Sequence, residues 1–272
     1  MKTAFGLDIA GYSTGKSGFA RADFIDKNSI EVTVYQDHIF SKTSKRKDEI
    51  KDQVKMEKEL LLACCKKGTI FVDIPIDLQS LLKSQNVFFT WELTLRPVDF
   101  AFDAMPPLAA WIGSPVARFL NLFSSIQEDF KYPLGKQIFE TYPACSLNLL
   151  GLPSKNYKNS EISLKNMQWI PKKSGEVLVE IANGMNLTAK EGISLNDDEL
   201  DAVICAITGI VDENYRLQGN ELTEYINSSI SNGNRYPAPM GYVLLKKKPE
   251  ININITKKIV KSHEEMLQVV AG

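Results

Sequence analysis

Short apolar runs, each closed by glycine or proline, recur along the first half of the chain. Residues 3–10, 68–75 and 136–143 are three such runs, and their length and apolar content predict buried strands. Between the first two, residues 30–35 alternate aliphatic and other side chains, which is typical of a half-buried strand. The pattern predicts a sheet of short strands, two of them joined as a hairpin.

Charged stretches between these runs predict helices. Residues 46–66 place apolar side chains among dense alternating charges, which is the pattern of an amphipathic helix. Further helices are expected near 174–183 and 198–212, and a late strand at 236–248. An antiparallel hairpin combined with strands that need crossovers indicates an α/β fold, with a mixed sheet and helices on its faces.

A single compact domain is expected for residues 1–248, with an aromatic, proline-interrupted insertion at about 76–130. No internal repeat or low-complexity linker divides it, and 272 residues suffice for one large core. For the C-terminal tail, residues 249–272, the pattern does not indicate whether the chain is ordered.

The stretch AGYSTGKS, residues 10–17, fits the loose spelling of a phosphate-binding P-loop. A P-loop requires a helix that opens at its Lys-Ser pair, because the amides and dipole of the helix N-terminus hold the phosphate. The residues that follow are instead β-formers separated by the turn-like DKNS. The stretch is therefore predicted to be the connection of a β-hairpin.

The composition is that of an ordinary globular domain, with 44% hydrophobic and 24% charged residues. Lys plus Arg number 32 against 33 Asp plus Glu, so the net charge of -1 gives no general attraction to nucleic acid or to anionic lipid. No run reaches the ~18 apolar residues of a membrane span, and the four cysteines lack a C-x-x-C spacing. We therefore expect a cytoplasmic protein with reduced thiols and no membrane association.

Three of the predicted strands each carry one acid among apolar neighbours: Asp8, Asp73 and Glu140. A buried, unpaired carboxylate is costly, so something should compensate each one. Exposure at a strand end, a loop amide, or an arginine partner such as Arg96 would suffice for any single acid. Together the three also fit a carboxylate cage for a hard divalent cation such as Mg2+ or Mn2+.

A fourth acidic element opens the late helix, in the sequence NDDELDA. Asn196 or Asp197 is expected to cap this helix, and acids in its first turn complement the helix dipole. Asp198 and Asp201 are three residues apart and lie on one helical face, an arrangement that can also bind a metal ion or water. Since the chain has only two histidines, a zinc cluster or a histidine-based triad is not expected.

Taken in order, these motifs resemble domain of unknown function family 429, a family of predicted nucleases with a ribonuclease-H-like fold. The matching pieces, spread over residues 3–248, are GLDIAG, VDIPI, the segment from Arg96 to Asp99, FETYPA, DDELDAVICAITG and GYVLLKKK. The layout of acids is also similar to that of RuvC-like junction resolvases. Asp77 departs from the family pattern, which more often has glycine at this position.

The resemblance implies a ribonuclease-H-like mixed sheet and two-metal hydrolysis of phosphodiester bonds in nucleic acid. The acids that would bind the metal ions are Asp8, as the bridging ligand, and Asp73, Asp198 and Asp201, and Glu140 is a further catalytic candidate. The candidates for contacts with substrate are Gly11, Ser13, Thr14, Lys16, Arg96 and Lys155. Basic residues within 42–47, 155–158 and 246–248 are either contacts to a nucleic-acid backbone or a solvated face.

Two other functions remain open. Actin-like and sugar-kinase folds share the ribonuclease-H-like core and hold ATP phosphates beside a first-strand aspartate, so a nucleotide-binding ATPase or phosphotransferase is one alternative. Such proteins usually contain two copies of the core, whereas this chain has no internal repeat. A non-catalytic binding protein with the same fold is the other alternative, because fold does not fix function.

Overall fold

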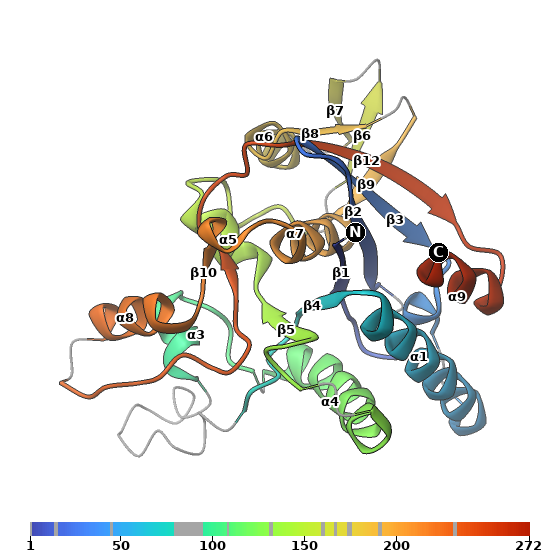
Figure 1. Ribbon diagram of the computed structural model, residues 1–272, viewed down its shortest axis with the longest axis horizontal. Coiled ribbons are helices and arrows are strands. Elements are labelled where there is room, and N and C mark those ends of the chain that lie inside the picture. Colours follow the sequence, from blue (N-terminus) through green and yellow to red (C-terminus); the bar gives the residue numbers. More distant parts are fainter. Residues whose placement is uncertain are drawn as a thin grey trace.

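The chain folds around one seven-stranded mixed sheet (Figure 1). The computed structural model describes residues 2–13, 16–43, 46–78, 95–107, 109–130, 133–158, 161–165, 168–172, 176–189, 192–230 and 233–272. In spatial order the strands of this sheet are β5 (Ile138–Thr141), β4 (Thr69–Asp73), β1 (Thr3–Asp8), β2 (Gly18–Asp26), β3 (Ser29–Gln36), β12 (Asn252–Ile259) and β8 (Leu187–Ala189). Strand β2 is antiparallel to its neighbours β1 and β3, and the other adjacent pairs of this sheet are parallel.

Helices and smaller sheets surround this sheet. The helices of the described residues are α1 (Lys47–Lys67), α3 (Pro97–Ala101), α4 (Ala110–Phe130), α5 (Pro143–Leu149), α6 (Glu176–Gly184), α7 (Asp197–Ile210), α8 (Gly219–Ser229) and α9 (His263–Ala271), with short 3-10 turns η1 (Ile39–Ser41) and η3 (Glu213–Tyr215). Strands β6 (Glu161–Lys165), β7 (Gln168–Lys172) and β9 (Ser194–Asn196) form a second sheet, and β10 (Arg216–Leu217) pairs with β11 (Leu244–Leu245). None of the helices in the described ranges is long and apolar enough to cross a bilayer.

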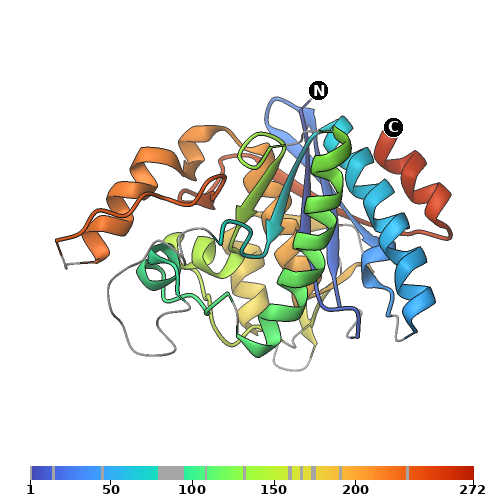
Figure 2. The same cartoon turned by 90° about the horizontal axis from the view of Figure 1, so that it is seen from below.

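Two layers of helices cover the two faces of the sheet, as Figures 1 and 2 show. On one face, Phe5 and Leu7 of β1 belong to a core shared with α1, α4 and α9. On the other face, Ala4 packs against α7, which crosses β1 and β2. This division follows from the two-residue period of a strand. The predicted α/β fold, a mixed sheet with helices on both faces, is confirmed, and its β3-β2-β1-β4-β5 order is compatible with a ribonuclease-H-like layout.

The predicted hairpin after β1 is also confirmed. Gly18 begins β2 and pairs with Asp8 at the end of β1, so no helix opens at Lys16-Ser17. Thr14 and Gly15 lie outside the described residues. Without a helix N-terminus, residues 10–17 do not form a P-loop.

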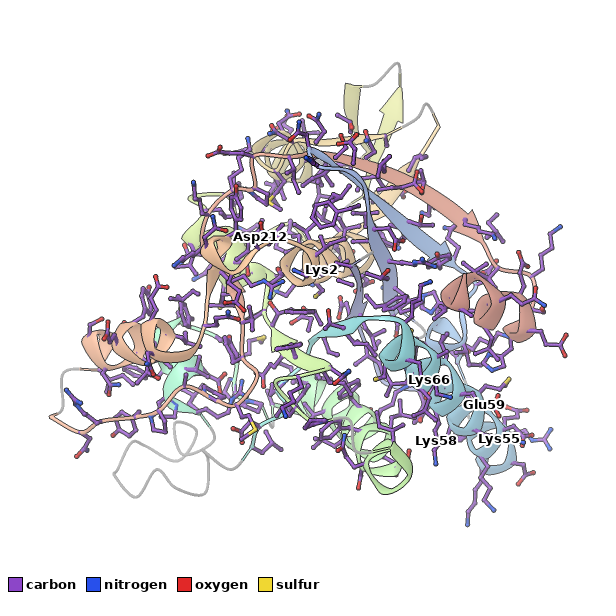
Figure 3. The ribbon with its side chains drawn as sticks, viewed as in Figure 1. Lys2, Lys55, Lys58, Glu59, Lys66 and Asp212 are labelled. Atoms are coloured by element: carbon purple, nitrogen blue, oxygen red, sulfur yellow. The ribbon has the colours of Figure 1, made fainter. Side chains whose placement is uncertain are left out.

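Helix α1 has the amphipathic character expected from its sequence. Its inner side carries fully buried leucines, Leu60 and Leu61, in the core with α4 and α9. Figure 3 shows Lys55, Glu59 and Lys66 along the same helix, and all three residues are exposed. The charged face of the predicted helix is thus its solvent face.

The second half of the chain differs from the predicted elements in two places. Residues 236–248 were predicted to be one strand, but only β11 within them is a strand. Pro237 and Pro239 have no N–H to donate to a neighbouring strand, and Gly241 has a φ of +73°. Residues 249–272, for which no order is predicted, form β12 and α9. In β12, Ile253 and Ile255 are buried and alternate with polar residues, so a strand signal is present in the sequence.

The segment predicted as an insertion contributes to the core. Residues 79–94 and 108 lie outside the described residues. The remainder includes α4, whose Phe119, Leu122 and Ile126 are fully buried in the core shared with α1. This helix therefore covers part of one sheet face.

Candidate metal centre

Asp8 and Asp73 are the last residues of two adjacent parallel strands, β1 and β4. Leu7 pairs with Val72, so the next residue of each strand lies at the same edge of the sheet. Both strands are apolar until that point, and their carboxylates therefore appear where the buried runs end. In an open sheet with parallel strands, the carboxyl ends of the strands are the usual place for a ligand.

Asp201 comes to this edge from helix α7. A capping box starts the helix: Asn196 Oδ1 accepts the N–H of Glu199 at 2.8 Å, and Glu199 Oε2 accepts the N–H of Asn196 at 3.0 Å. The helix lies directly on the sheet because β1 has Gly6 beneath it, where a Cβ atom would be 1.9 Å from the carbonyl oxygen of Ala202. The close approach buries Asp201 completely.

The three carboxylates form one group. One oxygen from each of Asp8, Asp73 and Asp201 lies within 4.8 Å of the others. Asp198, three residues before Asp201, is not a member of this group but lines the adjacent cavity with Asp8 and Asp73. The structure thus brings together three of the four acids for which the sequence implied metal binding.

Crowding and burial shift the acidities of all these groups. Burial, with the neighbouring Asp201 carboxylate, raises the pKa of Asp73 to about 8. Burial likewise raises the pKa of Asp8 well above its usual range and raises that of Asp201. For Asp198, burial and then Asp197 raise the pKa to about 6. The pKa values rise because burial and neighbouring acids disfavour the ionised forms, which a nearby cation would stabilise.

The chemistry of the group follows from its own donor atoms. No family model, curated protein or solved structure matches this chain. The three ligand atoms are all carboxylate oxygens, held by a strand pair and a helix. Such a buried cluster of acids can bind a metal ion.

Lys158 lies inside the acidic group, although the sequence placed it among residues of a basic run. Its Nζ donates to Asp201 Oδ2 and lies 4.0 Å from Asp8 Oδ2. Burial lowers the pKa of Lys158, but the carboxylates of Asp201 and Asp8 raise it more, and the net shift is upward. The side chain is 50% exposed, so part of it is open to solvent.

Tyr157 is a site residue that the sequence analysis missed. Its hydroxyl donates to Asp201 Oδ1 at 2.9 Å, and its ring lies 5.3 Å from the Lys158 ammonium. The residue is 1% exposed. A single aromatic residue inside the otherwise polar loop 153–158 was the available signal, since a buried ring fixes a loop to the core.

Glu140 lies apart from the acidic group, in a buried ion pair with Arg96. The two residues are 2% and 1% exposed, and Arg96 is also bonded to Asp99. Glu140 Oε2 accepts the backbone N–H of Ile76 at 2.8 Å. The sequence analysis expected an arginine, a loop amide or exposure to stabilise a buried strand carboxylate, and Glu140 has both the arginine and the loop amide. Arg96 lines the cavity of the metal centre, but its guanidinium is committed to these two acids.

The loop after Asp8 forms a wall beside the group. Arg118 of α4 donates to the carbonyl oxygen of Ala10 at 2.6 Å, and the N–H of Ala10 donates to Ser17 Oγ at 3.0 Å. Gly11 is buried against α4, where a Cβ atom would be 2.6 Å from Ser114 Oγ.

Of the other predicted substrate contacts in this loop, Ser13 and Lys16 are exposed, and Lys16 lines the cavity. Thr14 lies outside the described residues.

The remaining predicted positions lie around or away from the cavity. Lys155 lines it but is largely exposed and pairs with the exposed Asp103 at 3.0 Å. Asp77 Oδ2 accepts the N–H of Met240 at 3.0 Å and is outside the acidic group. Arg46 and Lys246 form ion pairs with acids near them, while Lys45 is outside the described residues. The basic runs therefore do not gather into one described site.

Proposed function

We propose that this protein is a metal-dependent hydrolase that cleaves phosphodiester bonds in nucleic acid. The observation that carries the proposal is the convergence of Asp8, Asp73 and Asp201 within 4.8 Å at the carboxyl edge of a mixed sheet. The strand order is compatible with a ribonuclease-H-like layout, in which the family resemblance expects these acids. The support is geometric, because the net charge of -1 adds no general attraction to a polyanion.

Carboxylate oxygens favour a hard cation, so Mg2+ or Mn2+ is the proposed cofactor. Asp8 and Asp73 would hold it, with Asp201 and Asp198 on the side of α7. When bound, a divalent ion lowers the pKa of water and stabilises negative charge on a phosphate oxygen. The protein residues supply the rigid frame for this chemistry, since two of the acids end strands and the third is fixed on a packed helix.

The cavity next to the acids offers positive groups to a phosphate. It has a volume of about 480 Å³ and is lined by Lys16, Lys155 and Lys158 as well as by Asp8, Asp73 and Asp198. Lys16 and Lys155 are exposed, so a backbone phosphate can reach them from solvent. We assign both lysines to substrate binding, together with Ser13 and the described part of the loop after Asp8.

A metal titration followed by a hydrolysis assay tests the proposal. Mg2+ or Mn2+ should raise the melting temperature, because an ion at a 100-fold excess over Kd adds about 2.7 kcal/mol to the free energy of unfolding. Single-stranded, duplex and branched DNA and RNA should be tested with the same ions. Asp8→Asn and Asp73→Asn should lose both the thermal shift and the cleavage. Asp48→Asn is the matched control, because Asp48 is 83% exposed on α1.

A second function is favoured by the size of the cavity. A volume of about 480 Å³ is within the range of sites for small molecules, so a mononucleotide with its metal ion is a reasonable ligand. An ATP-dependent thermal shift that requires Mg2+, with no cleavage of any nucleic acid, would favour the nucleotide-binding alternative. Absence of binding to ions, ATP and nucleic acid alike would favour the non-catalytic alternative.

A further inference from the structure

An ammonium group already lies among the carboxylates of the metal centre. Lys158 Nζ is hydrogen-bonded to Asp201 Oδ2 and lies 4.0 Å from Asp8 Oδ2. An ammonium in contact with one carboxylate and close to a second is located as a bound cation would be. The arrangement is asymmetric, because the contact with Asp201 is direct and that with Asp8 is at the limit of an ion pair.

Asp201 is the acid that holds this ammonium. Tyr157 OH donates to Asp201 Oδ1 at 2.9 Å, and Lys158 donates to Asp201 Oδ2, so each of its oxygens has a donor from the same loop. Tyr157 is 1% exposed and keeps the loop next to α7. Among the described residues, Asp73 has neither a hydrogen bond nor an ion pair. The oxygens open to a metal ion are therefore mainly those of Asp8 and Asp73.

The charge of the group is consistent with one divalent ion. Once a bound ion has displaced their protons, the carboxylates of Asp8, Asp73 and Asp201 together with the Lys158 ammonium carry a net charge of -2, which a single Mg2+ or Mn2+ neutralises. Two divalent ions would leave the group positive and would place the second ion next to the ammonium. Two-metal sites hold their ions only about 3.5–4 Å apart, so a second ion on Asp201 would compete with Lys158 for the same carboxylate.

We propose that Lys158 permanently fills one of the two cation positions, so that the protein binds a single divalent ion between Asp8 and Asp73. This inference rests on the proposed metal-dependent function, and it replaces the two metal ions that the family resemblance implies by one ion plus an ammonium. The Lys158 side chain is 50% exposed and lines the cavity. Its ammonium thus takes the place of the second ion beside a substrate phosphate, as a positioning and charge-stabilising group.

Lys155 provides the contrast that makes the inference specific. It belongs to the same loop and lines the same cavity, but it pairs with Asp103, and both side chains are largely exposed, at 76% and 88%. Exposed pairs of this kind contribute little to stability. A change at Lys155 therefore alters the local charge by the same amount as a change at Lys158 without emptying a cation position.

The test is the number of Mn2+ ions bound per chain, measured by calorimetric titration and by electron paramagnetic resonance of the bound ion. The wild type should bind one ion. Lys158→Met should bind two ions, the second showing magnetic coupling to the first, and Lys158→Arg should again bind one. Lys155→Met should bind one ion with the affinity of the wild type. Thermal unfolding of each variant shows that it is folded before the titration.

Two results would overturn the inference while the proposed function stands. One is a wild type that binds two coupled ions, a result that needs no variant to fold. The other is a folded Lys158→Met protein that binds one ion as the wild type does. If the wild type binds no Mn2+ and cleaves no nucleic acid, the proposed function is wrong together with the inference, and this result differs from the two above.

Discussion

Arg96 binds Glu140 through both terminal nitrogens: Nη1 lies 2.8 Å from Oε2, and Nη2 lies 2.5 Å from Oε1. Arg96 also binds both oxygens of Asp99, at 2.9 Å through Nε and 2.8 Å through Nη2. The three side chains are nearly inaccessible to solvent. Glu140 lies within β5 and accepts the N–H of Ile76 just after β4, and Arg96 Nη1 donates to the carbonyl oxygen of Asp77 at 3.3 Å, so the ion pair joins β5 to the segment that follows β4. Its role in the fold is to fix the edge of the sheet beside the acidic group.

Removing this arginine should destabilise the fold. Arg96→Met leaves two buried carboxylates without their partner, and breaking a buried pair typically costs about 3–5 kcal/mol. Urea denaturation measures this change in the free energy of unfolding. Lys155→Met, which removes a cation from an exposed pair, is the control and should change the free energy by less than about 1 kcal/mol.

The same ion pair separates Glu140 from Asp8, Asp73 and Asp201, the proposed metal ligands. Glu140→Gln should retain Mn2+ binding, because its oxygens face Arg96 and the loop amide. Asp73→Asn should lose the ion. Calorimetric titration compares the two variants, and a Glu140→Gln protein that loses Mn2+ as Asp73→Asn does would show that the acid contributes to the centre.

Stability without metal should fall as the pH rises from about 4 to about 8. Burial, with Asp201 nearby, raises the pKa of Asp73 to about 8 in the folded protein, whereas an aspartate in an unfolded chain titrates near about 3.9. Between these values the folded state keeps a proton that the unfolded state has lost, so the unfolding free energy decreases with pH and levels off above the folded pKa. Asp73→Asn removes this contribution.

A divalent ion competes with that proton, so its affinity should increase over the same interval. Urea unfolding from pH 5 to 9, in EDTA and in saturating Mg2+, measures both effects. With saturating Mg2+ the decline should be reduced. A difference between wild type and Asp73→Asn that does not change with pH would contradict the assignment of this proton to Asp73.

The sequence predicted the parts of the centre that depend on local position. Asp8 and Asp73 each end an apolar run, and adjacent parallel strands must present their ends at one edge, so their proximity followed from the strand prediction. Asp201 followed from the three-residue spacing to Asp198 on a helix with an apolar face. Both arguments use only the periods of strands and helices.

Partners that are distant in the sequence could not be predicted in the same way. Tyr157 and Lys158 reach Asp201 across 44 and 43 residues, from a loop whose basic residues were interpreted as contacts to a nucleic-acid backbone or as a solvated face. The sequence allowed several ways to stabilise the buried Glu140 carboxylate. The pairing of Glu140 with Arg96 depends on how the segment after β4 packs. The β12 strand was missed because an alternation of Asn and Ile is a weak signal without a neighbouring strand to pair with.

Glycine at position 6 should be required to keep Asp201 in place. A Cβ atom there would lie 1.9 Å from Ala202 O and 2.5 Å from Ala206 N, both of them backbone atoms of α7. Gly6→Ala therefore has to move the helix, at a cost of about 1–3 kcal/mol or more. We expect a lower melting temperature and at least a tenfold weaker affinity for Mn2+. Gly151→Ala is the control, because its positive φ adds strain but no atom lies within 4 Å and Asp201 is not moved.

A buried ion pair between Glu57 of α1 and Arg118 of α4 should control the position of the loop that follows Asp8. Arg118 donates to Glu57 Oε1, to Phe40 O at 2.9 Å and to Ala10 O at 2.6 Å, and its guanidinium lies 4.3 Å from the Tyr12 ring. Arg118→Met leaves the completely buried Glu57 carboxylate without its charge partner and should cost about 3–5 kcal/mol.

The double variant Arg118→Met with Glu57→Met separates the effect of charge from that of loop position. Replacing both partners removes the buried charges, so most of the lost unfolding free energy should return. The bonds from Arg118 to the carbonyl oxygens of Ala10 and Phe40 do not return, and the loop beside Asp8 stays less constrained. Hydrogen exchange at the amide of Ala10, which is bonded to Ser17 Oγ, should therefore remain faster than in the wild type. Wild-type exchange in the double variant would show that the Ser17 hydrogen bond alone holds the loop.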